Sequence, residues 1–99
     1  MNDELARLQD AIRRLHGCES TYSRSDPVTE IFRGQTVWDG IVETFDLIGH
    51  PQAARCYAWK HRNDDGSNRF VAVLELPPVD SPVTAVRAAI VAESKGRKA

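Results

Sequence analysis

The chain has 99 residues, of which 41% are hydrophobic and 27% are charged, and its formal net charge at pH 7 is −1. Both fractions are close to globular averages and predict a single folded domain, while the absence of excess positive charge argues against a nucleic-acid partner. No signal peptide and no apolar run of about 20 residues are present, so we expect a cytoplasmic protein with reduced thiols and no membrane contact.

Residues 2–16 have the pattern of an amphipathic helix. Acidic residues at its start and basic residues at its end suit the helix dipole, and Gly17 favours termination in the left-handed conformation. One apolar stripe recurs at steps of three and four residues: Leu5, Leu8, Ile12 and Leu15. The pattern predicts a helix that packs one face on the rest of the domain.

A polar segment, 18–27, is expected to be a connecting loop, and the strand pattern begins at Val28. We place the first chain reversal at Gly34 and treat Gly40 as a bulge in a long second strand. An alternative makes Asp39-Gly40 the turn of a type I′ hairpin, because this dipeptide is favoured there. Either choice gives a strand on each side of the turn.

Two further strands are expected at 54–61 and 69–76, joined by the polar loop 63–68. Pro77-Pro78 ends the last strand, since neither proline can donate a ladder hydrogen bond. Ser81-Pro82 then begins a second helix that runs to about residue 93, and the tail 94–99 is expected to fray. The predicted fold class is α+β in a single domain, 1–99: helix, four-stranded mainly antiparallel sheet, helix.

Alternation along the third strand separates two faces. Cys56 and the flanking alanines point one way, whereas Tyr57 and Trp59 point the other, and the fourth strand is apolar on both faces. If both helices covered one face, the aromatic face would be an apolar patch of a kind that monomers rarely expose. We therefore predict a homodimer through this second sheet face. The alternative places one helix on each face.

Histidine and cysteine do not occur at metal-site spacings, and Cys56 and His61 fall on opposite faces of their strand, so no metal or cofactor is expected. No nucleophile elbow, zinc-protease motif or phosphate-binding loop is present. A generic acid–base set of Glu43, His50, His61 and Asp64 has no distinctive pattern. We therefore favour a function without catalysis.

The preferred function is a binding or protein-interaction module that acts through the dimer surface or a groove beside the aromatic residues. An alternative is a small-ligand-binding protein or small enzyme whose aromatic-lined pocket has histidines at its rim. A third is nucleic-acid binding by aromatic stacking on the sheet face. The candidate binding residues are Trp38, Tyr57, Trp59, His50, His61 and Arg55.

The central segment 36–59, TVWDGIVETFDLIGHPQAARCYAW, resembles short bacterial proteins of mobile elements, including products of integron gene cassettes. The resemblance covers about the central half of the chain. It includes Trp38, Gly40, Phe45, Gly49-His50-Pro51 and Tyr57-Ala58-Trp59. It implies a compact bacterial domain that often self-associates, and it implies no catalytic or binding residue.

Overall fold

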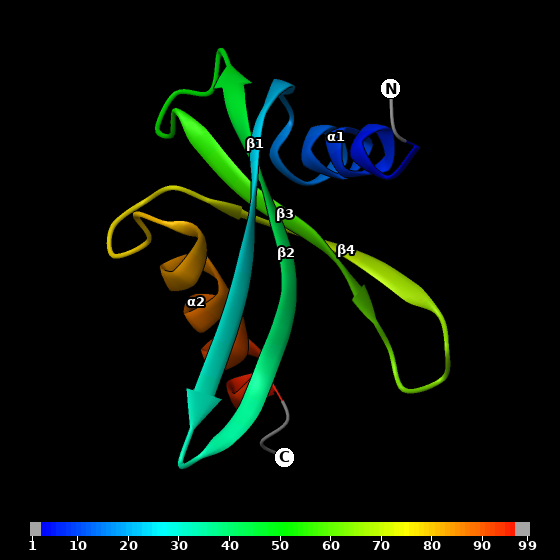
Figure 1. Cartoon of the computed structure of the whole chain (residues 1–99). Coiled ribbons are helices and arrows are strands. Elements are labelled where there is room, and N and C mark those ends of the chain that lie inside the picture. Colours follow the sequence, from blue (N-terminus) through cyan, green and yellow to red (C-terminus); the bar gives the residue numbers. More distant parts are fainter. Residues whose placement is uncertain (1–2, 97–99) are drawn as a thin grey trace.

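The computed structural model describes residues 3–96. The elements in chain order are α1 (Asp3–His16), β1 (Glu19–Phe32), β2 (Gln35–Ile48), β3 (Arg55–Arg62), β4 (Asn68–Leu74) and α2 (Pro82–Gly96). All neighbouring strands pair antiparallel in one sheet with the order β1-β2-β3-β4 (Figure 1). The predicted α+β fold is confirmed. The second helix runs past its expected end, and the last part of the tail expected to fray, 97–99, lies outside the described residues.

Helix α1 contacts the sheet through Leu8 and Ile12, which are fully buried as the apolar stripe predicts. Leu15, which belongs to the same stripe, is instead 59% exposed. In the last turn His16 approaches the sheet, and its Nε2 lies 3.0 Å from the carbonyl oxygen of Ala72 on β4. The stripe therefore ends one turn earlier than the sequence pattern indicates.

The polar segment expected to be a loop is the first half of β1, which begins at Glu19 and pairs with the far end of β2. This expectation was wrong because β1 is an edge strand, and an edge strand needs no apolar alternation where its faces are exposed. The turn lies at Arg33-Gly34, as preferred, and both residues have positive φ angles (54° and 78°). Positive φ at both central positions is the requirement of a type I′ turn.

Gly40 is not a bulge. It pairs in regular register with Val28, and the register shifts between β1 and β2 lie at Tyr22/Arg24 and Glu30/Ile31. A Cβ atom at Gly40 would lie 3.1 Å from Cη2 of Trp38. Glycine at this position therefore makes room for the indole ring.

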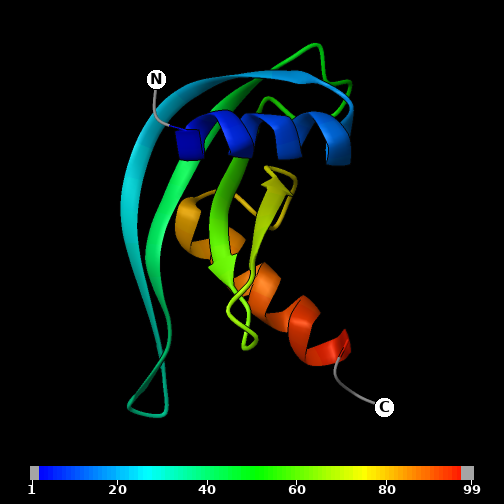
Figure 2. The ribbon, with the colours of Figure 1, turned by 90° about the vertical axis from the view of Figure 1, so that its right-hand side faces the viewer.

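The two helices lie on opposite faces of the sheet (Figures 1 and 2). The core on the α1 side consists of Leu8, Ile12, Phe45, Cys56 and Ala58. The core on the α2 side consists of Val28, Val42, Tyr57, Trp59, Val79, Ala85 and Val86. This arrangement explains why β4 is apolar on both faces. It confirms the alternative, with one helix on each face, and not the arrangement with both helices on one face from which the dimer was predicted. The face predicted to receive a second copy is covered by α2.

Candidate functional site

The tryptophans among the candidate binding residues belong to the core. Trp59 is 2% exposed, and Trp38, which is half-buried, packs edge-on against it with ring centroids 5.6 Å apart. Both lie under α2 with the α2-side core. They therefore offer no stacking platform for nucleotide bases, and they do not line the polar cavity described below.

The two candidate histidines lie apart from that cavity as well. Nδ1 of His50 accepts hydrogen bonds from the backbone N–H groups of Gln52 and Ala53, at 3.1 and 3.0 Å, and so holds the turn before β3. His61 is half-buried near the end of β3, where it pairs with Arg69 across the strands. Of the six candidates, Arg55 and Tyr57 line one cavity together.

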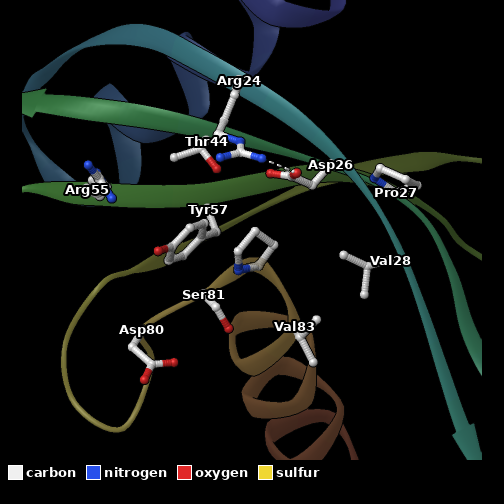
Figure 3. A pocket seen from close by; sticks show the side chains of 11 residues that line it. Arg24, Asp26, Pro27, Val28, Thr44, Arg55, Tyr57, Asp80, Ser81 and Val83 are labelled. Carbon is white, nitrogen blue, oxygen red and sulfur yellow. Dashed lines mark hydrogen bonds and ion pairs between the residues drawn. The ribbon is translucent and has the colours of Figure 1, made fainter.

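This cavity, of about 330 Å³, lies between the polar end of the sheet and the first turn of α2 (Figure 3). Strands β1, β2 and β3 each contribute side chains from the face that α2 covers farther along. Its charged and hydroxyl-bearing lining residues include Arg24, Asp26, Thr44, Arg55, Tyr57 and Asp80. We call it the polar cavity.

Tyr57 forms part of the wall of the polar cavity. Its hydroxyl donates a hydrogen bond to the carboxylate of Glu75. Burial, and secondarily this carboxylate, raises the pKa of Tyr57 to about 12. The phenol therefore stays protonated at neutral pH, and its proton is used in the hydrogen bond to Glu75.

Two side-chain oxygen atoms of residues that line the polar cavity have no hydrogen-bond partner among residues 3–96, and each has almost no solvent-accessible surface. One is Oγ1 of Thr44, a residue that is only 4% exposed. The other is Oδ2 of Asp26, whose Oδ1 accepts a hydrogen bond of 2.8 Å from Nη2 of Arg24. The sequence did not indicate this cluster because segment 18–27 was expected to be a loop. Arg24 and Asp26 were therefore not assigned to a face of the sheet beside Thr44.

A second hollow, of about 600 Å³, lies between the tip of the β1–β2 hairpin and the end of α2. Its apolar lining is unusually exposed: Ile31 at 65%, Phe32 at 62%, Val37 at 48% and Val91 at 52%. Arg87 of α2 forms an ion pair with Glu30 of β1 beside it. We call this surface the arm groove. The sequence signal for it is the pair of large apolar residues, Ile31 and Phe32, directly before the predicted turn at Gly34.

The described part of the chain shows no arrangement typical of metal or thiol chemistry. Among residues 3–96, no group of three or more His, Cys, Asp or Glu side chains could hold a metal ion. Both cysteines are free, and burial raises the pKa of the Cys56 thiol to about 12, which disfavours the nucleophilic thiolate. None of the described helices is long and apolar enough to cross a membrane.

Comparison with known proteins adds no relative. No protein-family model, no curated protein and no solved structure matches the chain. Function is therefore inferred from the two surface features, the polar cavity and the arm groove.

Proposed function

We propose that this domain is a non-enzymatic protein-interaction module that forms a homodimer through the arm groove. The observation that carries the proposal is the gathering of four exposed apolar side chains at the hairpin tip and the end of α2. Contiguous apolar surface of this kind commonly marks an interaction site, because it is costly to leave in water. Full burial of one such side chain is worth about 1.5–3 kcal/mol.

The shape of the surface suits a second copy of the same chain. The hairpin tip, which carries Ile31 and Phe32, extends past the other strands (Figure 2), and the groove lies directly beside it. A two-fold axis can therefore place the tip of each protomer in the groove of the other. Such an isologous contact uses one patch twice, which is the commonest arrangement in soluble dimers.

The charges beside the groove also suit self-association. Glu30 and Arg87 neutralise each other within one protomer, so two identical patches meet without a pair of unbalanced like charges. A stable interface buries about 800 Å² of each partner, so we expect the outer face of α2 to contribute beside the groove. The resemblance to self-associating bacterial proteins points in the same direction. The proposal moves the dimer contact from the sheet face, which α2 covers, to the arm groove.

Light scattering over a protein dilution series tests this proposal. We expect a dimeric mass for the unchanged chain and a monomeric mass for the double variant Phe32→Ser/Val91→Ser, because both side chains are more than half exposed within one chain. The variant should keep its thermal unfolding midpoint when both proteins are compared in dilute, dissociated solution. Leu15→Ser, at a similarly exposed site on α1, is the matched control and should remain dimeric. A monomeric unchanged chain at every concentration, or a dimeric double variant, would overturn the proposal.

A further inference from the structure

Helix α2 is apolar on its outer face as well as on the face that covers the sheet. Val86 is fully buried against the sheet, whereas Val91, on the other side of the helix, is 52% exposed. Between residues 83 and 92 the sequence contains only two polar side chains, Thr84 and Arg87. A helix that covers a core with one face normally carries polar side chains on the other, and a helix that is apolar all round is buried on all sides. The composition of α2 therefore indicates a partner on its outer face.

Both polar side chains of this outer face have partners within the chain. Oγ1 of Thr84 accepts hydrogen bonds from the backbone N–H groups of Asp80 and Ser81, at 2.9 and 3.0 Å. Arg87 donates a hydrogen bond from Nε to the carboxylate of Glu30 on β1, and this ion pair cancels its charge. Polar groups are costly to bury mainly when they lose their hydrogen bonds to water without replacement. An apolar surface can therefore cover the outer face of α2 with little loss of hydrogen bonding.

A hollow of about 530 Å³ lies on this outer face, and we call it the α2 hollow. Its lining consists of Pro78, Thr84, Arg87, Ala88, Val91 and Ala92. Arg87 and Val91 also line the arm groove, so the two hollows lie on either side of one ridge of α2. The apolar surface is therefore continuous from the tip of the β1–β2 hairpin across α2.

The apolar side chains of the arm groove are too few to form a stable dimer contact by themselves. The four of them are between 48% and 65% exposed. Even if each offered the area of a large aromatic side chain, about 150–250 Å², the four would supply roughly 450 Å². A stable interface takes about 800 Å² from each partner. The remaining area has to come from surface that adjoins the groove, and the α2 hollow adjoins it.

We propose that α2 crosses the α2 of a second copy at Val91, with Val91 of each protomer in the α2 hollow of the other. This inference rests on the proposed homodimer and assigns its second contact. Because Val91 lines both hollows, a two-fold axis beside it also brings the two arm grooves close to each other. The polar cavity does not contribute, because the unpartnered oxygens of Thr44 and Asp26 have almost no accessible surface.

The side-chain rows of α2 are complementary to themselves. Val83, Arg87 and Val91 follow one another at steps of four residues and form a ridge. The smaller Ala88 and Ala92 form a shallow row beside it, in the α2 hollow. The ridge of each helix can therefore pack over the alanine row of the other. Packing of such four-step rows gives a crossing angle of about 50° and a distance of about 8–10 Å between helix axes.

Disulfide trapping tests the crossing point. Val91→Cys and Val83→Cys are each introduced into a chain that also carries Cys18→Ala, so that the buried Cys56 is the other thiol, and oxidised glutathione is the oxidant. We expect Val91→Cys to give a covalent dimer, because a disulfide needs Cα atoms within about 7 Å and residues at the crossing meet their own copies. Val83→Cys is the matched control on the same ridge. It lies about 12 Å farther along the helix and should run as a monomer on a denaturing gel.

Ala92→Glu separates the α2 contact from the arm groove. Ala92 lines the α2 hollow but not the arm groove, and it is exposed, so the protomer should fold normally. The variant brings two like charges close to the two-fold axis and should weaken the dimer at least tenfold in a light-scattering dilution series. Ala6→Glu, at an exposed alanine of α1, is the matched control and should dimerise as the unchanged chain does.

The outcomes distinguish the crossing of α2 from the homodimer itself. Absence of the Val91→Cys cross-link, or full dimer affinity in Ala92→Glu, would overturn the crossing, while a dimeric mass of the unchanged chain would leave the arm-groove contact standing. Cross-linking of Val83→Cys in place of Val91→Cys would overturn the crossing as well. A monomeric unchanged chain at every concentration would overturn both proposals.

Discussion

At the scale of a single residue, Trp59 is a large buried member of the α2-side core. It is 2% exposed and contacts Trp38 edge-on, so its replacement leaves a large void between sheet and helix. We predict that Trp59→Ala lowers the free energy of unfolding by about 3–5 kcal/mol, as measured by urea denaturation. Leu15→Ala, at an exposed position, should change it by no more than about 0.5 kcal/mol. A loss below about 1 kcal/mol for Trp59→Ala would contradict its placement in the core.

The faces of β3 illustrate what single residues reveal from sequence. Alternation alone predicts that Cys56 and Ala58 face away from Tyr57 and Trp59, and the structure confirms this separation. Alternation does not say what covers each face, because that depends on the path of helices far away in the chain. For this reason Trp59 was expected at a subunit or ligand surface, although α2 buries it.

At the scale of one element, the Arg33-Gly34 turn sets the geometry of the β1–β2 hairpin. Gly34 has φ of 78°, and a Cβ atom there would meet nothing within 4 Å, so only backbone strain opposes a side chain. We predict that Gly34→Ala lowers the free energy of unfolding by about 1–2 kcal/mol. Gly34→Asn should lower it less, because asparagine tolerates the left-handed region. Denaturation of both variants checks the order, and equal losses for Ala and Asn would contradict the backbone explanation.

Strand β1 shows why an element can escape sequence reasoning. Its first half is polar, carries Pro27 and contains a register shift at Tyr22/Arg24, all of which favour a loop over a strand. These same features suit an edge strand, because proline and bulges discourage pairing with another chain. Strand β1 also places Arg24 and Asp26 beside Thr44. Because this part of β1 was not predicted from the sequence, the polar cavity was not predicted either.

The molecule as a whole is one sheet with a core on each side. Apart from the first half of β1, the order and type of the elements were predictable, because the other elements each have their own periodicity and their own turn or cap. The position of each helix was not, since the small residues of α2, such as Ala85, would let it approach either face. The arm groove and the polar cavity depend on that position, which explains why only Arg55 and Tyr57 of the polar cavity were expected.

The shared sheet predicts that the two cores unfold together. Ile12 is fully buried on the α1 side, whereas both tryptophans lie on the α2 side, and β3 contributes to both cores. Ile12→Ala should lower the free energy of unfolding by about 2–5 kcal/mol. Because both cores share one sheet, we expect them to unfold in one transition and to be destabilised together. At one fixed protein concentration, we therefore expect the denaturation midpoints by tryptophan fluorescence and by far-ultraviolet circular dichroism to shift equally. Leu15→Ala should shift neither. A fluorescence midpoint that stays at its original value while the dichroism midpoint falls would mean that the α2-side core folds independently of α1.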